Sequence, residues 1–389
     1  MQKNKEVRIV LILPGSMTSN WRRLEGVMQY VRAHSSWDVM TITNELTSAL
    51  LLQIQQFRPH GIICGTGNDA TLEPIVELGV PVVVVFRTNE CFAASPNVRF
   101  VLCESRDIAI KASDFMIERG YRNFAYLGRS TATWDTERGD EFAKALRNRG
   151  FALERPSPET RSDELIARLR ALPPHTAILA ADDITAASTI ALCSRHSIRI
   201  PQQLAILGVS NLALICENTH PPLSSIEQNL VYGGYLAATR LGSLLKGGIV
   251  PKVTRYKVGA VIDRGSLPPV ASIPPLPLDR ALDFINGHLS EPIEVPDVVK
   301  AVDISRRSLE NLFKQHLSTT IASVIRARRL EFLARKIQES TLPLVHICLS
   351  CGWTNLPHVK RIFKRHFCQT MSEYRSSPTK QDKSHLARR

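Results

Sequence analysis

Two stretches decide the fold of the C-terminal part of this chain: VPDVVKAVDISRRSLENLFK, residues 295–314, and LVHICLSCGWTNLPHVKRIFK, residues 344–364. Each shows apolar residues at helical spacing, then a short turn, then a second apolar helical face. A long helical pattern over Ser318–Gln338 joins them. Two helices linked by a tight turn are the geometry that places the second helix in the major groove of DNA. The sequence therefore predicts two tandem helix-turn-helix motifs.

The turns and caps of the two stretches follow the same plan. In the first, Asp303 and Ile304 form the turn and Ser305 is a good N-cap for the next helix. In the second, Gly352 supplies the turn. The apolar face of the second helix is repeated in both copies: Leu309, Leu312 and Phe313, then Val359, Ile362 and Phe363.

This pattern resembles the AraC/XylS family of regulators over Leu278 to Arg375, with mild departures. Asp303 stands where the family usually has Gly, and Cys368 and Met371 replace a usual Gly and Pro. The resemblance implies that one group of side chains faces base edges: Arg307, Glu310 and Asn311 on the first recognition helix, and Pro357, Lys360 and Arg361 on the second. A second group is expected to contact phosphate: Arg306, Lys314, Arg326, Arg328 and Lys364. Arg can read guanine and Asn adenine, whereas phosphate contacts position the protein without specifying sequence.

Charge supports a nucleic-acid partner for this part of the chain. The formal net charge of the protein is +13, but it is unevenly distributed. From Asp279 onward there are 19 Lys and Arg against 11 Asp and Glu, and before it 30 against 25. A concentrated basic excess is the electrostatic footprint of a phosphate-contacting module, although a solvated basic face gives the same count.

The N-terminal part alternates short apolar runs with amphipathic stretches, which is typical of buried parallel strands in βαβ units. We expect a doubly wound α/β structure long enough for two sheets. The predicted strands are Arg8–Leu13, Trp37–Thr43, Gly61–Cys64, Val80–Phe86, Asn123–Leu127, Thr176–Ala180 and Ala205–Val209. The predicted helices include Trp21–Arg32, Ile108–Glu118, Asp140–Arg149, Glu164–Leu172 and Ile184–His196.

Ser266–Leu278 holds five prolines in thirteen residues and no charge. Because proline fixes φ and sustains neither helix nor central strand, we expect a semi-rigid extended linker here. The predicted organisation is a sensor domain over residues 1–265, this linker, a helix-turn-helix domain over residues 279–375, and a disordered basic tail over residues 376–389.

The α/β part resembles the ligand-binding domain of LacI/GalR regulators and the two-lobed type I periplasmic sugar-binding proteins. The carrying stretches are GYRNFAYLG at residues 120–128, Arg138 with Phe142 and Leu146, ADD at residues 181–183, and ILGVSN at residues 206–211. A sensor placed before AraC-type motifs resembles the XylR-type xylose regulators. The resemblance implies a sugar bound between lobes that close on a hinge near Gly120, Pro221 and Gly248.

Candidate ligand residues follow the carboxyl ends of the predicted strands, where open α/β sheets bind small molecules. They are Phe86, Arg87, Trp134, Arg138, Asp183 and Asn211. Aromatic rings stack on sugar faces, and Arg, Asp and Asn hydrogen-bond hydroxyls. Ser210 stands where the family usually has Asp, which removes one acceptor and leaves open a sensor that has lost its ligand and only dimerises.

Other function classes have little support. The sequence has neither a complete glycine-rich phosphate loop nor a Gly-x-Ser-x-Gly elbow, so we expect no enzyme and no cofactor. His346, Cys348 and Cys351 lack a second ligand pair at zinc spacing and are interpreted as structural. The scattered cysteines and the absence of a spanning segment suit a cytoplasmic protein. The expected partners are a double-stranded DNA operator, a small sugar, a second copy of the chain and RNA polymerase, with activation as the commoner habit of the AraC-like group.

Overall fold

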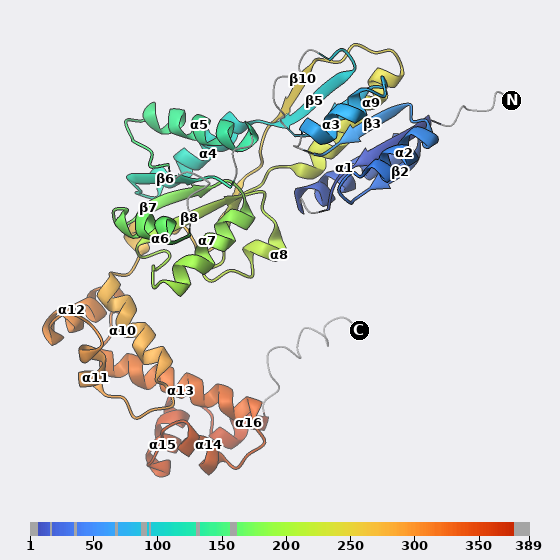
Figure 1. Ribbon diagram of the computed structural model, residues 1–389. Helices are drawn as coiled ribbons and strands as arrows, with labels where there is room; N and C mark the ends of the chain where they lie inside the picture. Colours follow the sequence, from blue (N-terminus) through green and yellow to red (C-terminus); the bar gives the residue numbers. More distant parts are fainter. Residues whose placement is uncertain are drawn as a thin grey trace. The chain divides into compact units, whose positions relative to one another are not determined.

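A computed structural model describes residues 7–15, 18–34, 37–66, 69–86, 92, 95–129, 133–155 and 162–376 of the chain. Contacts divide the chain into two compact units, Met1–Ile273 and Pro274–Arg389. The first unit contains two α/β lobes and the second contains only helices (Figure 1). The predicted fold class, a two-lobed sensor followed by tandem helix-turn-helix motifs, is confirmed.

The first lobe is built on a parallel six-stranded sheet in the order β10-β5-β4-β3-β1-β2. Helices cover both faces, so the central strands are buried on both sides and consist of continuous Val, Ile and Leu runs. The strands are β1 (Val7–Ile12), β2 (Trp37–Ile42), β3 (Gly61–Cys64), β4 (Val82–Val84), β5 (Val98–Cys103) and β10 (Val253–Tyr256). The helices are α1 (Thr18–His34), α2 (Ser48–Phe57), α3 (Asp69–Val76) and α9 (Leu230–Leu245).

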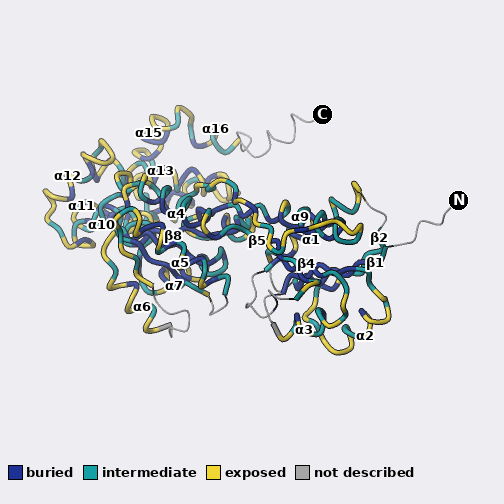
Figure 2. Tube along the Cα trace, turned by 90° about the horizontal axis from the view of Figure 1, so that it is seen from above, coloured by how far each residue is buried: buried dark blue, intermediate teal, exposed yellow. Residues whose placement is uncertain are grey.

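The second lobe contains a five-stranded sheet in the order β11-β9-β8-β7-β6, with only the short β11 antiparallel. Its strands are β6 (Asn123–Leu127), β7 (Thr176–Ala180), β8 (Leu204–Val209), β9 (Ser224–Ile226) and β11 (Val261–Ile262). Its helices are α4 (Ser105–Glu118), α5 (Thr133–Arg147), α6 (Ser162–Ala171), α7 (Asp183–Arg195) and α8 (Ala213–Cys216). Figure 2 shows the strands buried and the outer helix faces exposed in both lobes.

The chain crosses between the lobes at three places: Glu104 between β5 and α4, residues 227–229 between β9 and α9, and residues 257–260 between β10 and β11. The predicted hinge positions are therefore wrong. Gly120 follows the far end of α4, and Gly248 follows the far end of α9. The prediction assumed that glycines and prolines mark the hinge. The crossings instead lie where the chain leaves the sheet of one lobe and enters the other lobe, after β5, β9 and β10.

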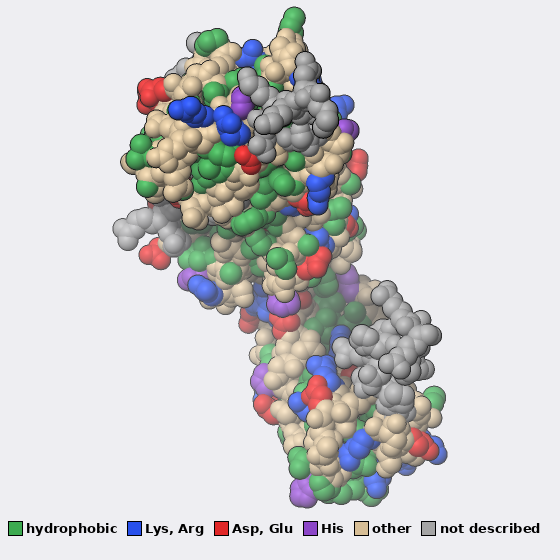
Figure 3. Space-filling model, turned by 90° about the vertical axis from the view of Figure 1, so that its right-hand side faces the viewer, with side chains coloured by type: hydrophobic (Ala, Val, Ile, Leu, Met, Phe, Trp, Pro, Cys, Tyr) green, Lys and Arg blue, Asp and Glu red, His purple; other side chains and the backbone are tan. Residues whose placement is uncertain are grey.

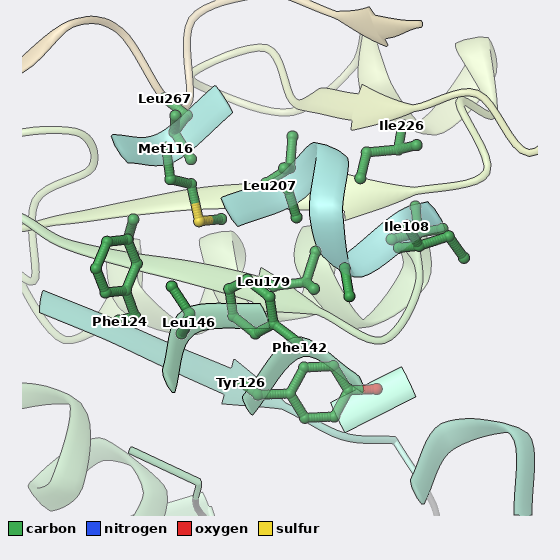
Figure 4. Close-up of a cluster of buried hydrophobic side chains, with 14 of the residues drawn as sticks. Ile108, Met116, Phe124, Tyr126, Phe142, Leu146, Leu179, Leu207, Ile226 and Leu267 are labelled. Carbon is green, nitrogen blue, oxygen red and sulfur yellow. The ribbon is translucent and has the colours of Figure 1, made fainter. Parts of the chain in front are cut away.

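The predicted linker is mostly folded, which corrects the prediction of an extended spacer. Ser266 and Leu267 are fully buried on the second lobe, and Figure 4 shows Leu267 beside Met116 in its core. Ser266 Oγ accepts a hydrogen bond from Ser224 N (2.8 Å), and the Tyr121 hydroxyl donates to the carbonyl of Pro268 (2.7 Å). At the other end, the segment from Leu276 onward is the first turn of the next helix, α10. Apolar side chains between the prolines have core partners, so only Pro274 and Pro275 separate the two units.

The second unit has two small cores that share one long helix. The helices are α10 (Leu276–Gly287), α11 (Val295–Lys300), α12 (Arg306–Leu317), α13 (Ile321–Glu339), α14 (Leu344–Ser350), α15 (Leu356–Phe367) and α16 (Met371–Ser376). The N-terminal half of α13 packs with α10–α12, and its C-terminal half packs with α14–α16. Residues 377–389, most of the predicted tail, lie outside the described residues. In the described part of the chain, every helix is too short or too polar to cross a membrane.

Candidate functional site

A cavity of about 90 Å³ lies between the two lobes, where strands end and helices begin. Since about 10–15 Å³ by this measure holds one water, the cavity has room for several waters or one small polar molecule. The first lobe and the crossing segments contribute Thr18, Ser19, Arg23, Val85, Phe86, Leu102, Cys103 and Gln228, and Ser105 at the start of α4 lines it from the second lobe. The second lobe contributes Arg129, Trp134, Glu137, Arg138, Asp182, Ile184, Ser210 and Leu212. This is the position at which open α/β sheets bind ligands.

Arg23 of α1 is the main cation on the first-lobe side. It is only 5% exposed, and it donates to Ser19 Oγ (2.9 Å) and Asn20 Oδ1 (3.3 Å). Its guanidinium carbon stacks 4.4 Å from the ring centre of Phe86. Burial lowers the pKa of Arg23, and a hydrogen bond with Tyr256 opposes this effect.

The close approach of α1 and α9 fixes the backbone of Arg23. Glycines make this approach possible: a Cβ on Gly234 would lie 2.0 Å from the Arg23 carbonyl oxygen, and one on Gly26 would lie 1.8 Å from the Val231 carbonyl oxygen. Any larger residue would force the helices apart. The two glycines therefore set the depth at which Arg23 enters the cavity.

Arg138 of α5 faces the same cavity from the second lobe. It is 6% exposed, and it donates to the carbonyl oxygen of Ala181 at the end of β7. Its guanidinium carbon lies 5.1 Å from the ring centre of Trp134, one turn earlier on α5. This arginine was predicted from the sequence, whereas Arg23 was not. No local sequence signal marks Arg23, because the other buried residues of α1 are Asn20, Gly26 and Val27 and do not form a simple apolar face.

Cys103, Ser210 and the crossing residue Gln228 form a neutral part of the cavity lining. Ser210 Oγ donates to Gln228 Oε1 (2.8 Å). Gln228 also hydrogen-bonds Cys103, the last residue of β5. Burial raises the pKa of the Cys103 thiol to about 11, so this group stays protonated at neutral pH. Ser210 has φ +122°, a conformation that L side chains rarely adopt.

The predicted ligand residues divide into three groups. Phe86, Trp134 and Arg138 line the cavity. Arg87 lies outside the described residues. Asp183 and Asn211 do not line the cavity. Their side-chain polar atoms make hydrogen bonds with other residues of the protein.

Asp183 is fully buried and accepts from Ser225 Oγ (2.5 Å) and Leu212 N (2.7 Å). Burial raises its pKa. The Asn211 amide donates to Glu227 Oε2 (3.1 Å), and its oxygen accepts from Arg264 (2.9 Å). Both residues hold the loop after β8 to β9 and to the crossing segment.

Asp182, which the sequence analysis passed over, is, with Glu137, one of two carboxylates among the described residues that line the cavity. It is the N-cap of α7, with Oδ1 accepting from Thr185 N (2.7 Å) and Oδ2 paired with Arg129 (2.8 Å). An N-cap residue lies outside the helix and points back past its first turn, whereas Asp183 is already helical and turns inward. The preference of Asp for N-caps is the sequence signal that distinguishes the two.

The helical unit exposes every residue predicted to contact DNA. On α12, Leu309 and Phe313 are buried while Arg306, Arg307, Glu310, Asn311 and Lys314 are exposed. On α15, Val359, Ile362 and Phe363 are buried while Pro357, Lys360, Arg361 and Lys364 are exposed. Arg326 and Arg328 are exposed on α13. Figure 3 shows Lys and Arg side chains spread over one face of this unit with acidic and polar groups between them.

Two contacts of these side chains bear on their availability. Arg306 Nε pairs with Glu310 Oε1 at 2.8 Å, so these neighbours on α12 hold each other. Arg361 Nη2 lies 3.3 Å from His358 Nδ1 on α15. A surface ion pair of this kind is weak, so DNA can exchange it for its own contacts.

A groove of about 590 Å³ runs between the two helix-turn-helix halves. It is lined by Arg306 and Arg326 from the first half and by His358 from the second. Arg329 of α13 ties the halves together, because it donates to the carbonyl of Gly352 (2.7 Å) and stacks on Trp353. Cys348 and Cys351 are buried in the second core, as the structural interpretation expects. Within the described ranges, no group of three or more His, Cys, Asp or Glu side chains is placed to hold a metal.

Comparisons with known proteins cover both parts of the chain. A family model for the periplasmic binding protein-like domain matches residues 113–267, and one for a helix-turn-helix domain matches residues 298–377. The xylose operon regulatory protein of Escherichia coli (strain K12) is 28% identical over 385 residues, covering 95% of this chain and 97% of that protein. The corresponding protein of Haemophilus influenzae is 25% identical over 387 residues, covering 95% and 98%. A solved structure of the xylose-binding transcription activator XylR matches with a TM-score of 0.69 at 26% identity, covering 96% and 98%.

The fold, the exposed recognition helices and these matches define the class. The chain is a DNA-binding transcription regulator, not an enzyme, in which a periplasmic-binding-protein-like sensor precedes an AraC-family helix-turn-helix domain. Within this class it is of the XylR type, because the similarity to the xylose operon regulators runs through both parts in the same order.

Proposed function

We propose that this regulator is an activator whose affinity for a specific operator is set by a small sugar, such as xylose, bound between the lobes. The observation that carries the proposal is the cavity lined by charged, polar and aromatic side chains from both lobes and from the segments that cross between them. A ligand that contacts both lobes stabilises their closed arrangement by its differential affinity for that state. The relatives named for xylose support a sugar-sized effector.

In the cavity, we assign Phe86 and Trp134 to the apolar faces of the ring and Arg138 to its oxygens. Sugars present both kinds of surface, so an aromatic wall and a guanidinium suit them together. Asp183 and Asn211 act through the shape of the loop that carries Ser210 and Leu212. Arg87 remains a predicted ligand residue.

On DNA, we assign base readout to Arg307, Glu310 and Asn311 of α12 and to Pro357, Lys360 and Arg361 of α15. Phosphate positioning falls to Arg306, Lys314, Arg326, Arg328 and Lys364. Because α13 joins the two recognition helices rigidly, they are expected to read successive major grooves about 34 Å apart on one DNA face. We expect the protein to work as a homodimer in the cytoplasm, where its DNA is, and to contact RNA polymerase as an activator.

The test combines effector binding with footprinting of the full chain. Purified protein is titrated with D-xylose and other pentoses and hexoses while its melting temperature is followed, since a ligand of the folded state stabilises it by mass action. DNase I footprints on the regulated promoter are then recorded with and without the stabilising sugar. Sugar-dependent protection of two successive grooves per protomer is the expected result. The competing function, a sensor that only dimerises, predicts the same footprint with no sugar effect on melting or on protection.

A further inference from the structure

The cavity between the lobes holds two buried guanidinium groups, one from each side. Arg23 and Arg138 are 5% and 6% exposed, and both line the cavity. Their partners are neutral: Ser19, Asn20 and Tyr256 for Arg23, and the Ala181 carbonyl for Arg138. The charge of Arg138 lowers the pKa of Arg23 further, so each cation feels the other. Burying two unpaired like charges is costly unless something of opposite sign completes the site.

The carboxylates of the cavity are engaged elsewhere. Glu137 Oε1 faces Arg255 at 3.3 Å, and Asp182 Oδ2 faces Arg129 at 2.8 Å. In the described part of the chain, no Asp or Glu oxygen lies within ion-pair distance of Arg23 or Arg138. The ionisable neighbours stay neutral as well, because burial raises the pKa of Cys103 to about 11 and that of Tyr256 to about 12. The excess charge of the cavity is therefore positive.

Hydrogen bonding points the same way. The Nε atoms of Arg23 and Arg138 are buried and have no acceptor. In the described part of the chain, four helices also begin at the cavity wall: α1 with Thr18 and Ser19, α4 with Ser105, α5 with Trp134, and α7 with Ile184. Helix N-termini carry free N–H groups and a partial positive charge, which favours an anion.

We propose that the effector carries an anionic group, a carboxylate or a phosphate, held between Arg23 and Arg138. This rests on the proposed function of the cavity as the effector site. Sugar acids and sugar phosphates are the matching class, because they combine such a group with hydroxyls for Ser19, Ser105 and Gln228. A neutral sugar can accept hydrogen bonds from both arginines but leaves two buried charges without a counter-charge. Arginine binds carboxylate and phosphate through charge-assisted, often bidentate, hydrogen bonds.

Two matched series of probes test the inference on the full chain at constant ionic strength. One series is D-xylose, D-xylonate and D-xylose 5-phosphate, and the other is D-glucose, D-gluconate and D-glucose 6-phosphate. In calorimetric titrations, at least one anionic member should bind about 10- to 100-fold more tightly than its neutral parent, the range that one or two charge-assisted bonds supply. The carboxylate and phosphate arms identify which anion the site accepts.

Variants locate the preference on the two arginines. Arg23→Gln and Arg138→Gln should reduce the affinity ratio of anion to neutral parent at least tenfold, whereas Arg23→Lys, which keeps a cation, should retain most of it. Arg32→Gln, an exposed position on α1, is the matched control and should leave the ratio unchanged. The ratio is insensitive to a general loss of stability, because both ligands bind the same folded fraction.

The outcomes separate this inference from the proposed function. If a neutral sugar binds as tightly as its acid and its phosphate, the anionic effector is wrong while the sugar-controlled regulator stands. If the anion preference persists in both Gln variants, the assignment to Arg23 and Arg138 is wrong. If none of the six probes binds, the sugar-type effector itself is overturned.

Discussion

Arg329 of α13 donates a hydrogen bond of 2.7 Å to the carbonyl oxygen of Gly352 in the turn of the second helix-turn-helix motif. The same turn lies against the first half of the unit: a Cβ on Gly352, whose φ is +70°, would lie 2.5 Å from the Ser290 carbonyl oxygen. One buried cation and one glycine thus fix how α15 stands relative to the long helix that the two motifs share. The spacing of the two recognition helices depends on this joint.

Replacing Arg329 with Ala should destabilise the second motif by about 1–3 kcal/mol, because two turn carbonyls lose their buried donor. Arg329 also donates to Cys351 at 3.3 Å, so both carbonyls are affected. Chemical denaturation of the variant measures the loss. In a footprint, protection by the α15 half should weaken before that by the α12 half. Arg335→Ala, exposed on the same helix, is the control, and an equal effect of the two variants would refute the joint.

Arg361→Ala should cost about 1–3 kcal/mol on the cognate operator and little on unrelated DNA, as expected for a base-reading side chain. Arg326→Ala should weaken binding to all sequences alike and reduce the slope of log affinity against log salt by about one. Both positions are exposed, so neither change should unfold the unit. Salt titrations on cognate and scrambled DNA distinguish the two. Unchanged cognate affinity for Arg361→Ala would remove that residue from the base-reading group.

Substitution of the neighbouring residues Asp182 and Asp183 should affect ligand affinity differently. Asp182→Asn keeps the N-cap of α7 but removes a charged acceptor at the cavity that also holds Arg129, so affinity for a neutral sugar such as D-xylose should fall about tenfold or more. Asp183→Asn keeps hydrogen bonds to Leu212 and Ser225 and lies outside the cavity lining, so effector affinity should stay near the wild-type value. Titration calorimetry on both variants gives the comparison. A large loss of binding in Asp183→Asn alone would restore it as a ligand residue.

The pH dependence of stability provides a separate test of Asp183. Its folded-state pKa is raised above the ordinary value of 3.8 by burial. Between these two pKa values the folded state holds more protons than the unfolded state, so stability falls as pH rises through the window. Asp183→Asn removes this slope, and at pH 7 the variant should be as stable as the wild type or more stable. Urea unfolding of both proteins from pH 4 to pH 7 checks the sign; a parallel pH profile in the variant would contradict it.

Coupling between effector and operator should pass through Pro274 and Pro275. A stiff junction transmits a change in sensor geometry, whereas a flexible one absorbs it. Replacing both with Gly should therefore leave effector affinity and operator affinity intact when each is measured alone. Their mutual tightening, typically about 5–150-fold in each direction, should disappear. If full coupling survives the replacement, a direct interface between the two units carries the signal instead.

The sequence predicted the locally determined parts of this fold well. Asn123–Leu127, Thr176–Ala180 and Gly61–Cys64 are strands with the predicted bounds, because continuous apolar runs between helices report burial on both faces. The missed strands β5, β9, β10 and β11 are short or carry polar residues, and β10 pairs with β5 about 150 residues earlier in the chain. Strands that pair across so many residues leave no pattern of hydrophobic residues in the local sequence from which the pairing could be predicted. The prediction of the hinge positions was wrong for the same reason, because the crossings depend on the order of the strands in the two sheets.

The candidate site shows the same division. Arg138, Trp134 and Phe86 follow strand ends or open a helix after one, so local reasoning placed them in the cavity. Arg23 depends on the close contact of α1 with α9, which begins about 200 residues later, and no local pattern announces it. To decide whether Asp182 or Asp183 lines the cavity, one must know which residue is the first of α7. The hydrophobic periodicity of a sequence does not locate helix ends to a single residue.

The folded segment Ser266–Ile273 changes how this protein can be taken apart. Ser266 donates to the carbonyl of Ile206 on β8 (2.6 Å), and Val270 N donates to Arg119 O (2.8 Å), so the segment is a seam of the second lobe. A graft that moves the helical unit onto a foreign sensor should be cut after Ile273. A cut at Gly265 would remove Leu267 and Ile273 from the core of the second lobe. It would also leave these apolar side chains without core partners in the fusion protein. In this chain, the stretch that can be cut without removing residues from either folded unit is therefore only Pro274 and Pro275.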